Sequence, residues 1–352
     1  MNRDFDAGTL VLAGSSALRV VRAQRRRAGF LPWEALNKVE QRRALTACVP
    51  RARDIDWPAL TALGAWNEDV DDALSLFVGS ASARADCNLV TCQIANDLPA
   101  KALVRINPWL VSASPAYLPI NLYDRLNEPE LYGLMLELTN NVSLSDRCGY
   151  LPPLSCPGND AEALVNYCNA NAACTPADIR SMLAKTGPRS KPARLKRYAA
   201  HLFEGADSPM ECIMGAQYVL PYSLGGFNCG PALFNHRIQY SDRARAISGM
   251  PYAVADCYFP ISKEILEYNG DYHSDPAARI HDERRNAALE TMGIKVVAIN
   301  WATIRDLDAL EAIAWDIHRR AGGRYQNRIS NRYWRQLELM NGLRRAFGLP
   351  SI

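Results

Sequence analysis

The segment that most constrains the fold of this chain is residues 254–273, in which two apolar runs flank a short connection. The first run carries Asp256, and the second carries Glu264 and Glu267. Such runs predict two strands joined by a tight turn. If the strands pair symmetrically about Ile261 and Ser262, Asp256 lies directly opposite Glu267, with Cβ atoms roughly 4.5–5.5 Å apart on one face of the sheet. Two carboxylates held this close repel each other unless a proton or a cation lies between them. The pattern therefore predicts a site for a hard divalent ion such as Mg²⁺, which takes oxygen ligands and can activate water for phosphodiester hydrolysis.

The same spacing has a simpler interpretation. A bulge would shift the register, so that one carboxylate points to solvent and each residue is an ordinary surface acid. Because paired acids near a hairpin are not specific to a site, the spacing alone favours this interpretation.

The pattern around this hairpin indicates an α/β fold. Ser208-Pro209-Met210-Glu211 predicts a helix start, with Ser at the N-cap, Pro at the first position and Glu three residues after the cap. The expected elements from there on are a helix over 208–220, strands over 232–240, 252–259 and 261–268, a helix over 276–292, a buried strand over 294–299 and helices over 306–320 and 324–347.

The N-terminal half has mixed α/β patterning. Its spacing predicts short helices over 10–45, strands and hairpins over 87–113, and helices from Ser114 and over 129–138. Residues 143–159 are rich in Gly, Pro, Ser and Cys and predict a loop, and 160–172 have helical spacing. Thr175-Pro176-Ala177-Asp178 predicts another helix start.

Composition excludes several classes of protein. The 352 residues are 48% hydrophobic and 22% charged, which excludes a disordered or fibrous chain. No apolar run approaches the ~20 residues of a membrane span, and no secretory signal is evident, so a cytoplasmic protein is expected. Its ten cysteines form no CxxC motif and are expected to be reduced, and five histidines are too few for a multi-histidine metal cage.

The net charge of +3 is an average over opposed segments. Residues 54–86 carry seven acids and one Arg, whereas 185–197 carry six basic residues and no acid, and 318–347 carry eight Arg and one Glu. Arginines interleaved with aromatic residues suit phosphate contacts and base stacking, so DNA binding is expected. A solvated helix that packs its apolar side on the domain explains the tail equally well. The residues expected to contact DNA are Lys191, Arg194, Arg197, Arg324, Arg328, Arg332 and Arg335.

Residues 208 to about 305 resemble the very-short-patch-repair-type endonuclease domain of the PD-(D/E)xK superfamily, in the compact form that many actinobacterial proteins carry. The motifs that carry the resemblance are Ser208-x-x-Glu211, Ala255-Asp256, Glu267-Tyr268-x-Gly270-x-x-His273, the helix pattern Asp282, Arg285, Leu289 and Gly293, and the strand 296–299. Segments 12–21 and 111–138 loosely resemble AbiEi-type antitoxins of type IV toxin–antitoxin systems. The resemblance implies a restriction-endonuclease-like mixed sheet flanked by helices.

The resemblance also implies roles for individual residues. Asp256 and Glu267 would be the metal ligands, and His273 would be a general base or a ligand through water. Glu211 would complete the acidic cluster, although a capping box with Ser208 explains it equally well. The supporting residues are Asn269, which stands where the superfamily has Lys, and the pair Asp282 and Arg285, which would brace the site or form an ordinary surface ion pair.

Four regions follow from these patterns. They are a mixed α/β domain over 1–145, a helical basic linker region over 146–206, a PD-(D/E)xK-like nuclease domain over 207–322 and a basic C-terminal helix over 323–352. The expected function is that of a Mg²⁺-dependent DNA endonuclease, with the N-terminal half positioning DNA or contacting a protein partner. The alternatives are a catalytically inactive antitoxin-like or regulatory DNA-binding protein and, more remotely, a protein-interaction scaffold.

Overall fold

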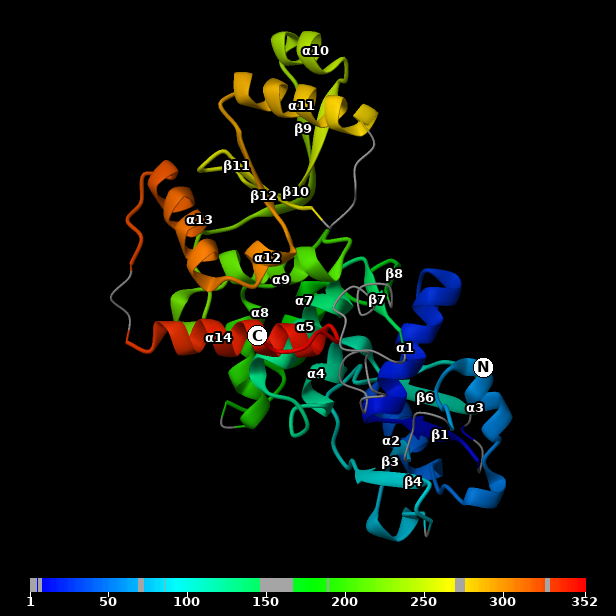
Figure 1. The fold of residues 1–352 in the computed structure, drawn as a ribbon. Coiled ribbons are helices and arrows are strands. Elements are labelled where there is room, and N and C mark those ends of the chain that lie inside the picture. The colour runs from blue at the N-terminus through cyan, green and yellow to red at the C-terminus, as the bar shows by residue number, and fades with distance from the viewer. Residues whose placement is uncertain are drawn as a thin grey trace. The chain divides into compact units, whose positions relative to one another are not determined.

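The protein has two compact units, each with its own sheet and core (Figure 1). The computed structural model describes residues 5, 8–68, 73–85, 87–145, 167–188, 190–269, 276–326 and 330–352. Unit 1 comprises residues 1–202 and 345–350, and unit 2 comprises residues 203–344 and 351–352. Helices and mixed sheets occur in both units, which confirms the α/β class.

Unit 1 is built on a six-stranded mixed sheet with the order β2-β5-β6-β1-β3-β4. Its strands are β1 (Leu10–Leu12), β2 (Glu34–Ala35), β3 (Leu74–Val78), β4 (Val90–Ile94), β5 (Leu103–Arg105) and β6 (Leu110–Ala113). The strands predicted within 87–113 are confirmed, and β5 and β6 pair antiparallel as a hairpin. Leu10–Leu12, expected to be helical, is a strand because it is fully buried between β6 and β3.

The helices of unit 1 begin with α1 (Gly14–Ala28), which carries three buried arginines. Arg22 donates two hydrogen bonds to the buried carboxylate of Glu137, at 2.8 and 2.7 Å. Arg25 donates to the backbone carbonyls of five residues, which lie between 137 and 171. The α-helices that follow are α2 (Lys38–Ala47), α3 (Trp57–Leu63), α4 (Leu118–Asn121), α5 (Glu128–Thr139), α7 (Pro176–Ala184) and α8 (Leu195–Ala199).

Between α5 and α7 a short antiparallel pair joins β7 (Val142–Leu144) to β8 (Tyr167–Asn169). The prediction of a helix over 160–172 is wrong in its described part, because 167–169 pair with β7 instead. The rest of that prediction, and most of the loop predicted over 143–159, lies outside the described residues. The helix start at Thr175 is confirmed, since its hydroxyl accepts a hydrogen bond from the backbone N–H of Asp178 and that carboxylate accepts one from the N–H of Thr175.

Unit 2 is built on a four-stranded mixed sheet with the order β12-β11-β10-β9. The strands are β9 (Leu233–Gln239), β10 (Tyr252–Phe259), β11 (Glu264–Tyr268) and β12 (Lys295–Ile299). Neighbours in β9, β10 and β11 pair antiparallel, and β12 runs parallel to β11. The helices are α9 (Pro209–Val219), α10 (Asp242–Ser248), α11 (Pro276–Thr291), α12 (Trp301–Ile304), α13 (Leu307–Arg320) and α14 (Arg332–Ala346).

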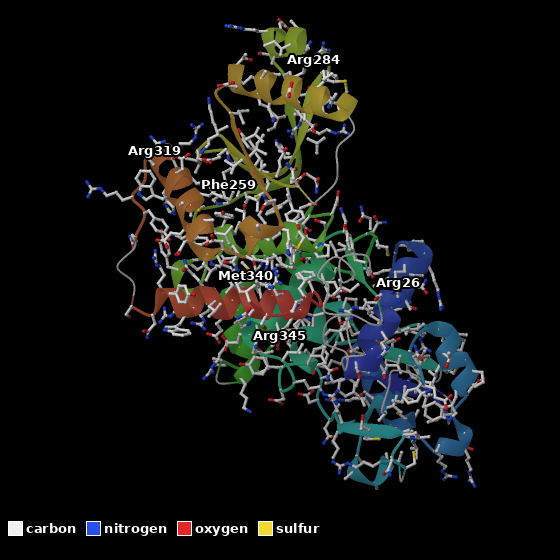
Figure 2. All side chains as sticks on the ribbon, in the orientation of Figure 1. Arg26, Phe259, Arg284, Arg319, Met340 and Arg345 are labelled. Atoms are coloured by element: carbon white, nitrogen blue, oxygen red, sulfur yellow. The ribbon has the colours of Figure 1, made fainter. Side chains whose placement is uncertain are left out.

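Helices α10 and α11 lie side by side and share an apolar core with the sheet (Figure 1). Buried members of that core are Ile238 of β9, Ala255 of β10, Ile265 of β11 and Leu289 of α11. Helix α9 contacts β10 and β11, where its Tyr218 packs edge-on against Phe259 (labelled in Figure 2). The predicted helices over 208–220, 276–292 and 306–320 are therefore confirmed, and the C-terminal helix begins at Arg332 rather than at 324.

The unit boundary lies between Leu202 and Phe203. The described residues of the predicted linker region up to 202 belong to unit 1, so they are part of a compact unit and not a separate connector. The helix predicted as a C-terminal region of its own belongs to unit 2 as far as Arg344. Within the described part of the chain, no helix is both long and apolar enough to cross a membrane, and the cysteines found there are free thiols.

Candidate functional site

The strand register of unit 2 places Asp256 opposite Glu267. Cys257 pairs with Leu266 and Tyr258 with Ile265, so the next pair along the same register is Asp256 with Glu267. The hairpin is therefore symmetric about Ile261 and Ser262, as the sequence predicts. Residues directly opposite in an antiparallel pair project to the same face of the sheet.

Asp256 is largely shielded from solvent at the end of the β10–β11 pairing. Its Oδ2 accepts a hydrogen bond from the backbone N–H of Tyr268 at 3.1 Å. Burial raises the pKa of the Asp256 carboxyl, and the carboxylate of Asp207 raises it further, while the Tyr268 N–H and the Arg285 guanidinium act in the opposite direction. Burial therefore destabilises the ionised form of Asp256. A cation bound beside this carboxylate would stabilise the ionised form.

Glu267 forms an ion pair with Arg285 of α11. Nη1 of Arg285 donates to Oε2 at 3.0 Å and Nη2 donates to Oε1, so both carboxylate oxygens are engaged by one planar guanidinium. Nη2 also donates to the backbone carbonyl of Val254 at 2.6 Å, which ties α11 to β10. Burial raises the pKa of Glu267, the charge of Asp256 raises it further, and Arg285 lowers it.

Ser208 caps the N-terminus of α9, and Glu211 lies in the first turn of that helix. The backbone N–H of Glu211 donates to Oγ of Ser208, and its carboxylate accepts hydrogen bonds from that hydroxyl at 2.8 Å and from the backbone N–H of Asp207 at 3.0 Å. Burial raises the pKa of Glu211, and the charge of Asp256 contributes to the same direction. Ser208 is the N-cap, as predicted, but the full capping box is not formed, because the Glu211 carboxylate accepts from the N–H of Asp207 and not from that of Ser208.

Asn235 of β9 is part of this arrangement although the sequence analysis does not single it out. Its amide donates to Oε2 of Glu211 at 2.8 Å and to the carbonyl of Gly205 at 2.7 Å. Pairs on both sides of it keep one register, which places Asn235 opposite Asp256 on the side away from Glu267. Its φ of 46° lies in the left-handed region that Asn tolerates better than most residues, and this conformation interrupts the pairing there. A single Asn in a strand that mixes polar and apolar residues gives no sequence signal for such a role.

Asn269 and Asp282, which are also predicted site residues, have exposed side chains outside the hydrogen bonds given above. Asn269 is exposed at the end of β11, where its backbone N–H donates to the carbonyl of Ile299. Asp282 is exposed on α11 with His281 as its neighbour at 3.8 Å, so Arg285 braces Glu267 and does not form the predicted surface pair with Asp282. His273 lies outside the described residues.

The carboxylates of Asp256 and Glu267 are the kind of oxygen ligands that a divalent ion prefers, but those of Glu267 are already engaged by hydrogen bonds. Among the hydrogen bonds of the described residues, none reaches Oδ1 of Asp256, whereas Arg285 engages both oxygens of Glu267. Within the same part of the chain, no group of three His, Cys, Asp or Glu side chains is arranged to hold a metal ion. A metal site here would be made by Asp256 and Glu267, with Arg285 moving off the carboxylate.

The predicted DNA contacts in the basic segment of unit 1 are exposed but already have acidic neighbours. Lys191 lies 3.5 Å from Asp124, and Arg194 and Arg197 lie 3.9 and 3.3 Å from Glu128. Exposed pairs of this kind are weak and leave the cations able to exchange partners.

The basic tail is divided between internal and exposed arginines. Arg332 donates to both oxygens of Glu311, at 2.5 and 2.7 Å, and Arg344 is buried against the ring of Trp301. Arg324 and Arg335 are exposed, and Arg328 lies outside the described residues. The prediction of a row of arginines facing DNA therefore does not hold for Arg332.

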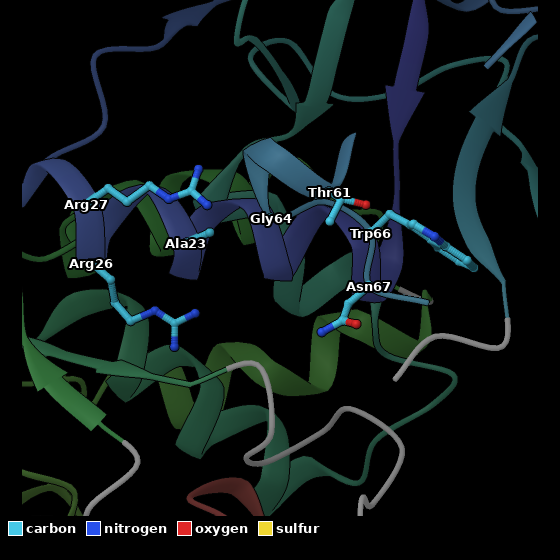
Figure 3. A pocket seen from close by; sticks show the side chains of 7 residues that line it. All are labelled: Ala23, Arg26, Arg27, Thr61, Gly64, Trp66 and Asn67. Carbon is cyan, nitrogen blue, oxygen red and sulfur yellow. The ribbon is translucent and has the colours of Figure 1, made fainter. Parts of the chain in front are cut away.

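Two cavities lie away from the acidic cluster. One, of about 250 Å³, is in unit 1, and the side chains of Arg26 and Arg27 extend along it from α1 (Figure 3). The other, of about 620 Å³, lies between α11 and β12 and includes Lys295 and Arg320 in its wall. Neither has Asp256, Glu211 or Glu267 in its lining.

Fold and site together define a mixed α/β protein of two units, with an acidic cluster on the sheet of the second. Comparisons of the chain with models of protein families, with curated proteins and with solved structures found no match.

Proposed function

We propose that unit 2 is a restriction-endonuclease-like domain that hydrolyses phosphodiester bonds in DNA with the help of Mg²⁺. The observation that supports this most is the register that sets Asp256 opposite Glu267 in a setting where burial raises the pKa of both. The order of elements supports it too, because a capped helix with Glu211 precedes the two strands that carry these acids. Buried carboxylates with raised pKa values are typical of sites that hold cations or transfer protons.

In this proposal Asp256 and Glu267 hold the divalent ion. When no ion is bound, the guanidinium of Arg285 neutralises the charge of Glu267 in its place. A divalent ion held there would supply a Lewis acid that lowers the pKa of a water and neutralises charge on the phosphate. Glu211 keeps its position because its carboxylate is fixed by Ser208, Asp207 and Asn235. Asn269 carries no charge, so the cation that the superfamily places there as Lys would have to come from another residue, and Arg285 is the cation in contact with the cluster.

The experiment is cleavage of supercoiled plasmid DNA by the full-length protein with Mg²⁺ and with EDTA. We expect nicking that requires the metal and falls more than about 100-fold in Asp256→Asn and in Glu267→Gln, because each variant removes a negatively charged ligand. Asp242→Asn is the matched control, since Asp242 is an exposed acid of α10 in the same unit. Nicking that persists in EDTA, or that survives both ligand substitutions, would contradict the proposal.

A second function is favoured by one specific observation. Arg285 already neutralises both oxygens of Glu267, and Asn269 replaces the superfamily Lys, so the domain could bind DNA without cutting it. Such a regulator, of the antitoxin-like kind, would show salt-sensitive duplex binding and no Mg²⁺-dependent cleavage. Under this alternative the N-terminal unit would contact a protein partner or position the DNA.

A further inference from the structure

Unit 2 carries three large aromatic side chains on its surface. Trp315 of α13 is 54% exposed, and Tyr333 and Trp334 at the start of α14 are 54% and 67% exposed. Aromatic side chains of this size usually contribute to a core, and when several are exposed together they mark an interaction site. Tyr333 and Trp334 contact each other edge to face, with ring centroids 5.8 Å apart.

An ion pair joins α13 to the start of α14 near these rings. Arg332 pairs with Glu311 of α13 and also donates to the hydroxyl of Tyr325 at 2.9 Å. Glu311 precedes Trp315 by one helical turn, a separation of about 5–6 Å between Cβ atoms. Arg332 immediately precedes Tyr333. Trp315 and Tyr333 are therefore each close along their helix to a residue of this ion pair. Trp334, two positions after Arg332, lies on another side of α14 and adjoins this region through its contact with Tyr333.

The charge around the rings is positive. From Trp315 to Arg335, both included, the sequence has six arginines and a single acidic residue, Asp316. Asp316 is itself paired, with Lys295 at 2.5 Å and with Arg319 at 2.6 Å. The Arg319 guanidinium lies 5.8 Å from the Trp315 ring, on α13, and is labelled in Figure 2. Arg324 and Arg335 are exposed as well.

We infer that this aromatic–arginine surface, made of Trp315, Tyr333, Trp334, Arg319, Arg324 and Arg335, binds unpaired nucleotides of a DNA strand. Flat exposed rings can stack on bases only where the base faces are not covered by a duplex, and the arginines provide phosphate contacts. Aromatic residues and arginine are also enriched in protein interfaces, so binding to a second copy of the chain is one of the outcomes of the test. The inference rests on the proposed function, and it narrows the substrate to DNA with a single-stranded segment.

The test is binding of a fluorescein-labelled oligo-dT and of a duplex of equal length, measured by anisotropy in EDTA so that cleavage plays no part. We expect the full-length protein to prefer the single strand. Each stacked base contributes about 1–3 kcal/mol, so Trp315→Ala and Trp334→Ala together should weaken oligo-dT binding at least about 25-fold. Trp315→Phe with Trp334→Phe keeps a stacking face and should retain most of the affinity.

Two further variants separate stacking from other effects. Ile261→Ala removes an apolar side chain that is 70% exposed in the β10–β11 turn, and it should leave binding unchanged. Arg324→Gln with Arg335→Gln should make the dependence of log affinity on log salt shallower by about 1.4, because each phosphate contact on a single strand contributes about 0.7.

The outcomes are distinguishable. Oligo-dT affinity that is equal in the wild type and in the double Trp→Ala variant overturns the inference, and it leaves the proposed nuclease intact because the plasmid assay is independent. A protein that prefers the duplex also overturns the inference. If only the double Trp→Ala variant loses oligo-dT binding, and the wild type does not cut plasmid, the result supports the inferred binding surface and contradicts the proposed nuclease activity. If the wild type forms a dimer and does not bind oligo-dT, and the double Trp→Ala variant is a monomer, the surface binds a second copy of this chain. This result overturns the inference.

Discussion

At Glu267 the guanidinium of Arg285 occupies the place that a metal ion would take in the proposed site. Arg285 donates to both of its oxygens and to the Val254 carbonyl, so the guanidinium neutralises the acid and also joins α11 to β10. A buried ion pair contributes little net stability while both partners are present, but removing one partner leaves an uncompensated charge. If the proposed site is correct, a substitution of Arg285 therefore changes both the stability of the fold and the affinity for a metal ion.

The first prediction concerns Arg285→Gln. Without the guanidinium the pKa of Glu267 moves further above its ordinary value, and the free energy of unfolding at neutral pH should fall by about 2 kcal/mol. The freed carboxylate should bind Mn²⁺ more tightly, so added Mn²⁺ should restore part of the lost melting temperature. Scanning calorimetry with and without Mn²⁺ measures both effects. Arg284→Gln, an exposed neighbour on α11, is the control and should change neither.

The second prediction concerns the pH dependence of Asp256→Asn. Because burial raises the pKa of Asp256 in the folded state, its contribution to stability is complete below the unfolded pKa of about 3.9 and is lost as the pH rises through the folded pKa. Asn keeps an oxygen that accepts the Tyr268 N–H and carries no charge. The variant should therefore be more stable by about 1 kcal/mol near pH 7 and no more stable near pH 3. Urea unfolding at the two pH values measures this, and a variant that is destabilised at neutral pH contradicts it.

The pairing of the two acids could be predicted at the residue scale, but their surroundings could not. A hairpin with a short symmetric turn has one natural register, so the positions of Asp256 and Glu267 follow from counting. The contact of Arg285 depends on how α11 crosses the sheet, which the spacing of its own residues does not determine. Asn235 contacts Glu211 from a left-handed backbone conformation that no local sequence pattern predicts.

At the scale of elements, the start of α9 serves the helix and the acidic cluster together. The Ser208 hydroxyl accepts from the Glu211 N–H and donates to the Glu211 carboxylate. The same residues therefore cap a helix and fix the direction in which a carboxylate points.

The third prediction compares two helix caps. Ser208→Ala and Ser241→Ala each remove an N-cap hydroxyl that accepts a backbone N–H, at α9 and at α10, so each should cost about 1 kcal/mol of unfolding free energy. Only Ser208→Ala also removes a donor to Glu211. We expect it alone to weaken Mn²⁺ binding in calorimetry. Equal metal affinity in the two variants would show that Glu211 acts only at the helix start.

Elements with strong local signals were predictable, and those that depend on distant partners were not. The capped helices at Thr175 and Ser208 and the hairpin of β10 and β11 follow from spacing and capping residues. The strand Leu10–Leu12 has three residues and takes its form from pairing with β6, a segment about 100 residues away. Residues 167–169 are extended only because β7 pairs with them.

At the scale of the whole molecule, the chain divides into two units whose buried contacts differ in kind. Unit 1 depends on Arg22 and Arg25, which are buried with their partners, and unit 2 depends on an apolar core beneath α10 and α11. The near-neutral total charge conceals this division, because the acidic segment 54–86 and the basic tail belong to different units.

The fourth prediction locates a destabilisation in one unit. Arg25→Leu leaves five carbonyls without their donor and should cost unit 1 about 3 kcal/mol or more. Arg25→Lys should not restore it, since a point charge cannot replace a planar group with several donors. Hydrogen exchange by mass spectrometry should show the loss of protection mainly in peptides of unit 1. Equal loss in peptides of unit 2 would contradict separate cores.

The measurement that tests the central claim most directly is calorimetric titration of Mn²⁺ into the full-length protein. The account predicts binding in the wild type and in Asp242→Asn, and none in the double variant Asp256→Asn with Glu267→Gln. Equal binding in the double variant, or no binding in Arg285→Gln where Glu267 is released, would contradict a metal site between these two strands.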